Sequence, residues 1–215
     1  MYKKIVYVIA TVIIMFTVIS EAEAKKGFYM GLGATYNTID GKFNGSGGLK
    51  SDTDTIILPD IKNAFGVDIL GGYGINDSWS IELNLMVSEH SGEWSGLTGD
   101  VDYASFSING KYSFRSSDMT QPYLLFGISG NSLFIKNGSK NTATGEVGDA
   151  TLSGAGVNFG AGIDTYITPH VSLTLGIMYR FVDYTEASGV DHSGTIDDGI
   201  NGSGVSFLLT TAYHF

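Results

Sequence analysis

The last thirteen residues of the chain, 203–215, alternate between two kinds of side chain. From Val205 onward every second position is apolar or aromatic, apart from one threonine, and the positions between are mostly small or polar. Strict period-two alternation is typical of a β-strand whose two faces lie in different environments. A length of about ten residues suits a tilted strand that crosses a lipid bilayer. The alternating set is Val205, Phe207, Leu209, Thr211, Tyr213 and Phe215.

The first 24 residues have the three parts of a secretory signal peptide. Basic Lys3 and Lys4 precede an apolar run over residues 5–19, and Ala22-Glu23-Ala24 supplies a small-x-small cleavage site. The alternative, an uncleaved anchor helix, needs about 20 apolar residues. We therefore predict a signal peptide over residues 1–24 and a single domain over residues 25–215.

Seven further segments show the same alternation. The connections between strands are alternately long polar loops and short turns. The absence of cysteine excludes disulfides and thiol chemistry, and the 30 glycines and 24 Phe plus Tyr favour β structure. The predicted loops cover residues 40–62, 89–99, 134–154 and 183–202. In the fifth strand Leu124, Phe126 and Ile128 compete with Tyr123 and Leu125, so its facing stays open. The predicted strands cover residues 27–37, 63–75, 79–88, 101–114, 122–133, 155–167, 171–181 and 203–215.

Five charged residues fall on the strand faces opposite the aliphatic and aromatic stripes. A soluble, lipocalin-like barrel would hold its apolar face inside, whereas a membrane barrel turns it towards lipid. A Lys or Arg facing lipid at the bilayer midplane costs up to about 2–4 kcal/mol, so the charges indicate the polar interior of a transmembrane barrel. We predict an all-β, eight-stranded antiparallel up-and-down transmembrane β-barrel. The charges are Asp68, Glu82, Lys111, Asp164 and Arg180.

Inside a narrow lumen, unpaired ions would be strongly destabilising. We therefore interpret these five residues as a salt-bridge network that fills the barrel, with a gated path for small ions as the alternative. At eight strands the interior is about wide enough to be filled by side chains, so no wide channel is expected.

Several stretches resemble one known family. Asn109-Gly-Lys-Tyr-Ser-Phe, Pro122-Tyr, and Gly162-Ile-Asp with Tyr179-Arg-Phe are similar to strands of the small barrels that include the transmembrane part of outer-membrane protein A and the opacity-type surface antigens. The resemblance implies the bacterial outer membrane, with contacts to its lipid and lipopolysaccharide. It also implies that the barrel-assembly machinery recognises the last strand through Phe207, Tyr213 and Phe215.

The net charge of −10 resides in the four predicted long loops when the second is counted with the strand start through Asp102, and the remaining strands and turns sum to zero. This acidity argues against nucleic acid as a partner and favours a basic or cation-bridged partner outside the cell, such as a host surface. Divalent ions could link Asp52, Asp54, Asp197 or Asp198 to lipopolysaccharide phosphates. No loop has complete calcium-site spacing, so we expect no metal and no cofactor.

One segment resembles a catalytic motif. His170-Val171-Ser172, with Glu186 further on, is similar to the His-x-Ser pair of lipid A deacylases. Along an extended strand, Ser172 and Glu186 would lie well over about 30 Å apart at about 3.3 Å per residue. We therefore predict a non-enzymatic barrel that serves envelope integrity and surface adhesion or antigen roles. A narrow ion-conducting channel and a lipid A-modifying enzyme are the alternatives.

Overall fold

The computed structural model describes residues 26–40, 47–50, 54–94, 97–114, 119–190 and 193–215. The predicted signal peptide therefore lies outside the described residues. The described secondary structure consists of twelve strands. They are β1 (Gly27–Asn37), β2 (Gly47–Lys50), β3 (Asp54–Leu58), β4 (Asp60–Ile61), β5 (Ala64–Gly74), β6 (Trp79–Trp94), β7 (Leu97–Ser113), β8 (Thr120–Asn141), β9 (Val147–Thr168), β10 (Val171–Ser188), β11 (Ser193–Asn201) and β12 (Gly204–His214).

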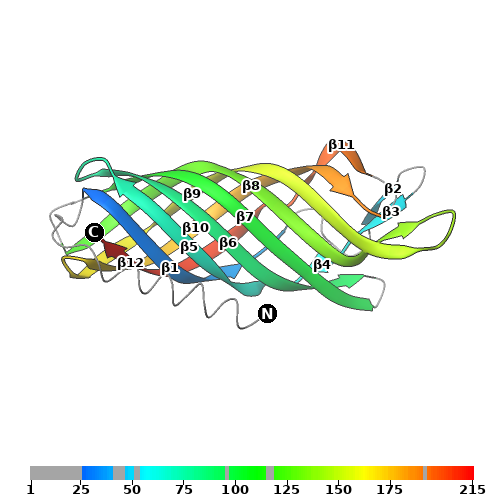
Figure 1. Ribbon diagram of the computed structural model, residues 1–215, viewed down its shortest axis with the longest axis horizontal. Helices are drawn as coiled ribbons and strands as arrows, with labels where there is room; N and C mark the ends of the chain where they lie inside the picture. Colours follow the sequence, from blue (N-terminus) through cyan, green and yellow to red (C-terminus); the bar gives the residue numbers. More distant parts are fainter. Residues whose placement is uncertain (1–25, 41–46, 51–53, 95–96, 115–118, 191–192) are drawn as a thin grey trace.

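Eight of these strands close into a ring in which every neighbouring pair is antiparallel. The order is β1, β5, β6, β7, β8, β9, β10 and β12, and β12 pairs with β1 to complete the circle. Figure 1 shows the resulting barrel, with strands tilted to its long axis. The ring confirms the predicted eight-stranded antiparallel barrel. No helix among the described residues is long and apolar enough to cross a membrane.

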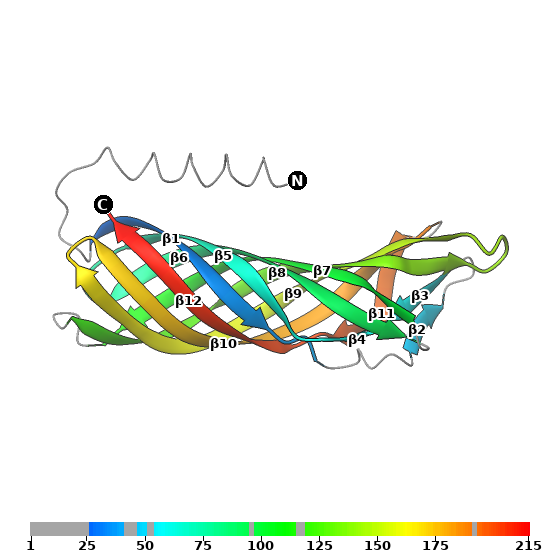
Figure 2. The same ribbon diagram turned by 90° about the horizontal axis from the view of Figure 1, so that it is seen from below.

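The two ends of the barrel differ. Short connections such as residues 75–78 and 169–170 lie at one end, the turn end, where β1 starts and β12 stops. Long hairpins extend from the other end, the hairpin end, where Figure 2 shows β2, β3, β4 and β11 gathered. Three predicted loops, 89–99, 134–154 and 183–202, are mostly strand here. Those three loop predictions were therefore largely wrong.

The remaining predicted loop, residues 40–62, also contains short strands. β3 pairs with the far end of β8, and β4 pairs with β6 through Asp60 and Glu93. These short strands bring Ile56, Leu58 and Ile61 into the interior of the hairpin end, where all three are buried. Burial of three large aliphatic side chains stabilises this arrangement by about 1.5–3 kcal/mol for each.

A belt of exposed apolar side chains surrounds the ring. The alternation places aliphatic and aromatic residues outward on all eight ring strands, many of them 40–60% exposed. The open question about β8 is answered, because Leu124, Phe126 and Ile128 point outward and Tyr123 is buried inside. Exposed apolar surface of this extent fits contact with lipid.

The interior changes character along the barrel axis. Towards the turn end it is polar, as predicted. Towards the hairpin end it is an apolar core, which the sequence reasoning did not foresee. This core joins β7–β11 to the inserted segment β3–β4. Its members include Ile39, Ile56, Leu58, Ile61, Val101, Leu133, Ile135, Leu152, Val182, Tyr184 and Ile200.

Candidate functional site

Lys111 is the centre of the polar interior. It faces inward from β7, and its Nζ lies 3.1 Å from Glu82 Oε1 on β6 and 2.7 Å from Asp164 Oδ2 on β9. All three side chains are buried. One ammonium between two carboxylates satisfies the Coulombic requirement for keeping the lysine charged in a closed interior.

Aromatic and hydroxyl groups complete the shell around this ion triad. Tyr29 donates its hydroxyl to Glu82 Oε1 at 2.8 Å, and Thr174 donates to Asp164 Oδ1 at 2.7 Å. The ammonium of Lys111 also lies 4.2 Å from the centre of the Tyr123 ring. These partners hold both carboxylates and the lysine in one geometry, as buried ions require.

A ladder of amide side chains crosses the lumen beside the triad. Asn109 donates to Asn84 Oδ1 at 2.9 Å and accepts from Asn158 Nδ2 at 3.1 Å. Ser129 donates to Asn158 Oδ1 at 3.1 Å. Side chains from β6, β7, β8 and β9 are thus linked across the interior. Reading the polar face of each predicted strand as one set would have identified the three asparagines but not Ser129, because the facing of its strand was open.

Asp68 joins the cluster only weakly. Its carboxylate accepts from Asn84 Nδ2 at 3.4 and 3.5 Å, at the long limit for a hydrogen bond. It is buried and has no basic partner among the described residues within ion-pair distance. The structure therefore brings Asp68 close to the triad without pairing it.

Arg180 lies apart from the other four predicted charges. Its guanidinium donates to the Tyr103 hydroxyl and, at 3.2 Å, to the Thr38 carbonyl oxygen. It also lies 4.6 Å from the centre of the Tyr103 ring. Among the described residues no carboxylate forms an ion pair with it, and its Nε has no hydrogen-bond partner. The five charges thus form a triad, a neighbouring acid and a separate arginine.

The space left in the lumen is small. Two hollows, one opening near the turn end and one beside Asn84 and Asn109, have volumes of about 30 Å³ each. A hollow of this size holds one or two water molecules. The described lumen therefore contains a packed polar layer and, beyond it, the apolar core.

The hairpin end carries exposed acids and few bases. Lys62 pairs with Asp60 at 2.9 Å and with Glu93 at 3.4 Å, and Lys136 pairs with Asp100 at 2.8 Å. The hydrogen bond that Lys62 donates to Asp60, followed by the one that it donates to Glu93, raises the pKa of Lys62. Exposed pairs of this kind are screened by solvent and contribute little to stability.

Two further acids at the hairpin end face each other. Glu89 on β6 and Asp102 on β7 are directly opposite in the antiparallel pairing. The Asp100 hydrogen bond raises the pKa of Lys136, and the charges of Asp102 and Glu89 raise it further, so this lysine lies in their field. Like charges directly across two strands are destabilising. We call Glu89, Asp100 and Asp102 the acidic face.

The deacylase-like residues are not assembled. Ser172 Oγ lies 2.9 Å from Nε2 of His214, and His170 Nδ1 lies 3.0 Å from the His214 carbonyl oxygen. Glu186 is near the opposite end of β10, fourteen residues away, a distance of about 45 Å at about 3.3 Å per residue. Sequence reasoning missed the Ser172–His214 contact because β10 and β12 become neighbours only through ring closure.

The remaining predicted residues are placed as follows. Phe207 faces outward from β12, and Tyr213 packs against Phe215 with ring centres 5.2 Å apart. Asp52 lies outside the described residues, as do the side chains of Asp54, Asp197 and Asp198. In the described part of the chain, no three His, Asp or Glu side chains are grouped to hold a metal ion.

Comparisons with known proteins agree with this architecture. The family model for the outer membrane protein beta-barrel domain matches residues 8–215. Neisserial surface protein A is similar in structure, with 17% identity, a TM-score of 0.60, and coverage of 88% of this chain and 98% of that chain. OprG from Pseudomonas aeruginosa has 14% identity, a TM-score of 0.57, and coverage of 89% and 97%.

A third similar structure is Ail, the attachment invasion locus protein of Yersinia pestis. It has 17% identity, a TM-score of 0.51, and coverage of 88% of this chain and 99% of that chain. A search of the curated proteins finds no match. The family match spans most of the chain, and the ring and apolar belt fit the bacterial outer membrane. The chain belongs to the outer membrane protein β-barrel family.

Proposed function

We propose that this outer-membrane barrel is a non-enzymatic surface protein that contributes to envelope integrity and contacts a basic partner outside the cell. In outer-membrane barrels the short turns face the periplasm and the longer connections face outward. The hairpin end is then extracellular. The observation that carries the proposal is a strand-built extracellular extension, cored by apolar residues, with acids on its surface.

The apolar core supports a binding role because it makes the extension a fixed platform. Leu133 and Ile135 on β8 and Leu152 on β9 are fully buried, and the inserted Leu58 packs into the same cluster. A surface held in place before binding loses less conformational entropy when a partner docks. This arrangement favours recognition by a shaped surface over recognition by mobile loops.

The charge of the platform favours a basic partner. Glu89 and Asp102 face each other, and a cationic group between them would relieve their repulsion. Ail has been solved in complex with the heparin analogue sucrose octasulfate, which is a polyanion. The acidic face of this chain is negatively charged like that ligand, so we do not expect the chain to bind it.

Binding of a basic polypeptide to cells that display the protein tests the proposal. We expect fluorescent polylysine to bind, and to bind less as salt is raised from low to physiological ionic strength, because exposed charges are screened. The double variant Glu89→Gln/Asp102→Asn should lose most of this binding. Glu146→Gln, an exposed acid at the hairpin end outside the acidic face, is the matched control and should bind as the parent does.

Equal binding by the acidic-face variant and the parent would contradict the proposal. A preference for sulfated polyanions over polylysine would contradict the partner chemistry. Heat-modifiable migration of unboiled samples on electrophoresis shows whether each variant is folded, so that loss of binding is not confused with loss of the barrel.

The packed interior supports a closed barrel over an ion channel. Ions would have to cross both the Lys111 triad and the apolar core, where an unpaired charge is costly. We expect no single-channel current from the reconstituted protein. A non-enzymatic barrel should also leave lipid A unchanged in cells that overproduce the protein.

A further inference from the structure

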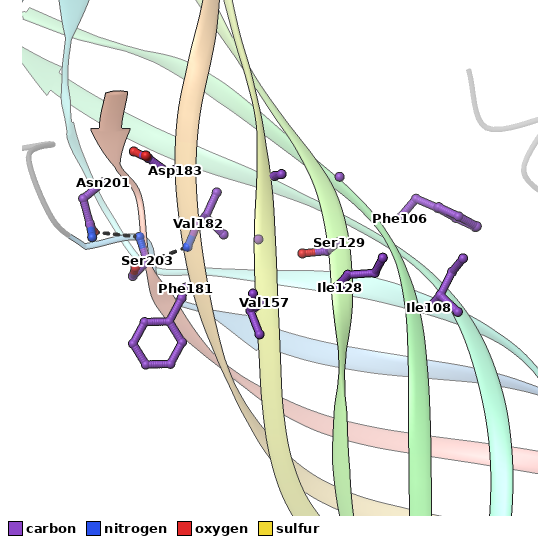
Figure 3. Close-up of a pocket in the computed structure, with 13 residues that line it drawn as sticks. Phe106, Ile108, Ile128, Ser129, Val157, Phe181, Val182, Asp183, Asn201 and Ser203 are labelled. Carbon is purple, nitrogen blue, oxygen red and sulfur yellow. Dashed lines mark hydrogen bonds between the residues drawn. The ribbon is translucent and has the colours of Figure 1, made fainter. Parts of the chain in front are cut away.

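The hollows of the described molecule differ in their surroundings. The largest, about 750 Å³, lies on the outer wall over β7–β10, and Figure 3 shows Phe106, Ile108 and Phe181 around it. This hollow is open and mostly apolar, as a wall in contact with the membrane requires. A much smaller hollow, about 30 Å³, lies inside the lumen, and the side chain of Asp68 lines it. A buried charge therefore borders the inner hollow.

Asp68 is a buried carboxylate whose charge is not balanced. It is 1% exposed. Among the described residues it accepts hydrogen bonds only from Asn84 Nδ2, at 3.4 and 3.5 Å, beyond the usual range of about 2.7–3.2 Å for an N–H···O bond. The ammonium of Lys111 is held elsewhere, by Glu82 and Asp164 at 3.1 and 2.7 Å. A carboxylate buried without a counterion is strongly destabilising.

The charge of the surrounding polar layer is uneven. Three carboxylates, those of Asp68, Glu82 and Asp164, share one ammonium, that of Lys111, so the layer has two negative charges in excess. Arg180 does not balance this charge, because its guanidinium donates to a tyrosine hydroxyl and a backbone carbonyl oxygen. A cation from solution would reduce the imbalance.

Oxygen atoms surround the inner hollow from several strands. The register places Thr210, Gly33 and Asp68 in one row across β12, β1 and β5. A Cβ added to Gly33 would collide with Thr210 Oγ1, so this hydroxyl leans over the glycine. Carboxylate, amide and hydroxyl oxygens are the ligands that hard cations prefer. The lining side chains that contain oxygen are Asp68, Glu82, Asn84, Asn109, Tyr123, Thr174 and Thr210.

The inner hollow can be reached from the turn end. Another hollow of about 30 Å³ lies there against the connection at residues 76–78, and it shares Leu70, Lys111 and Thr174 with the inner one. On its other side the inner hollow is bounded by Met178, a member of the apolar core. A cation can therefore enter from the periplasmic side, whereas the core opposes its passage outward.

We propose that the inner hollow is a binding site for one small monovalent cation, with sodium as the ion that fits it. Asp68 supplies the charge, and the amide and hydroxyl oxygens supply the other contacts. One such ion matches the single unpaired carboxylate and halves the excess charge of the layer. The volume accommodates the ion together with a water molecule. The expectation of no metal rested on the spacing of the loop acids, whereas these ligands come from separate strands.

Equilibrium binding of radioactive sodium to the purified barrel, followed by scintillation proximity, tests this proposal. We expect saturation at one sodium ion per barrel. Unlabelled sodium should compete, whereas choline, which is too large for the hollow, should not. Asp68→Asn should abolish binding. Glu146→Gln, an exposed acid at the hairpin end, is the matched control and should bind sodium as the parent does.

Denaturant titration in vesicles of zwitterionic lipid supplies a second measurement. Sodium at ten times its dissociation constant should raise the folding equilibrium constant of the parent about elevenfold over choline at equal ionic strength. Asp68→Asn should be equally stable in both salts, and in choline it should be more stable than the parent, because it buries no charge there. Thr210→Val keeps the carboxylate but removes a hydroxyl, so it should bind sodium more weakly than the parent.

Three results would overturn the proposal. The first is no sodium retained by the parent, or equal retention by Asp68→Asn. The second is equal stability of the parent in sodium and in choline, which would leave a proton as the ion that neutralises Asp68. The third is tighter binding of Mg²⁺ than of sodium, which would assign the hollow to a divalent metal.

Discussion

Removing the Lys111 ammonium should be the most destabilising single change to the polar interior. At an effective dielectric of about 20, its contacts with Glu82 and Asp164 at 3.1 and 2.7 Å correspond to attractions of about 5 and 6 kcal/mol. Desolvation of the ions offsets several kcal/mol of this. Lys111→Met leaves two buried carboxylates without a counterion, and we expect a loss of about 3–5 kcal/mol in the free energy of unfolding.

Denaturant titration of the barrel in lipid vesicles measures this loss, with the fluorescence of Trp79 and Trp94 and the mobility of unboiled samples as signals. Lys136→Met is the matched control, because the Lys136–Asp100 pair is exposed and should contribute little to stability. The triple variant Lys111→Met/Glu82→Gln/Asp164→Asn should recover most of the loss, since it leaves no ion in the triad. Equal effects of the two single lysine variants would refute the argument.

Three further outcomes are expected. Burial lowers the pKa of His90, which lies beyond the membrane belt; below about pH 6.5 the unfolded chain gains a proton that the folded chain resists. The hairpin end should therefore lose stability as the pH is lowered, which hydrogen exchange measures. The variant His90→Gln should not show this loss. Leu58→Ala should cost about 2–5 kcal/mol locally and make the segment around β3 sensitive to protease while the ring stays folded. Gly162→Val should lower the folded yield, because its side chain would collide with the Leu175 carbonyl and the Tyr123 ring, whereas Gly71→Val should be tolerated.

The sequence was sufficient to predict the ring because lipid and lumen impose opposite polarity on alternate residues. β12 was predicted as residues 203–215 and is Gly204–His214, and β1 has the predicted bounds. Both strands stay within the belt, where the contrast between their faces is strong. The facing of β8 could not be predicted, because Tyr123 and Leu125 make its inner face almost as apolar as the outer one.

The strand extensions were missed for a related reason. Beyond Val87 the outer face of β6 continues as Glu89, Ser91 and Glu93, because water replaces lipid there. The apolar alternation disappears although the strand continues, and a reading based on that contrast assigns a loop. Only the pairing with β7, which runs unbroken to Trp94, shows that the structure is regular.

The depth of the interior charges along the barrel axis could not be predicted from the sequence. Period-two alternation places Glu82, Lys111 and Arg180 on the inner face, but it carries no information about depth along the axis. Depth depends on strand register and tilt, which are fixed when all eight strands pair. Arg180 consequently lies beside Tyr103, away from the carboxylates that surround Lys111.

The seam between β1 and β12 has a consequence for how the protein is made. Tyr29 pairs with His214, 185 residues later. The backbone groups on this edge of β1 therefore stay unpaired until the last strand is in place. Until then both β1 and β10 present unpaired backbone groups that can recruit other chains. Sequence changes along this seam should therefore reduce the yield of correctly assembled barrel more than they weaken the barrels that do form.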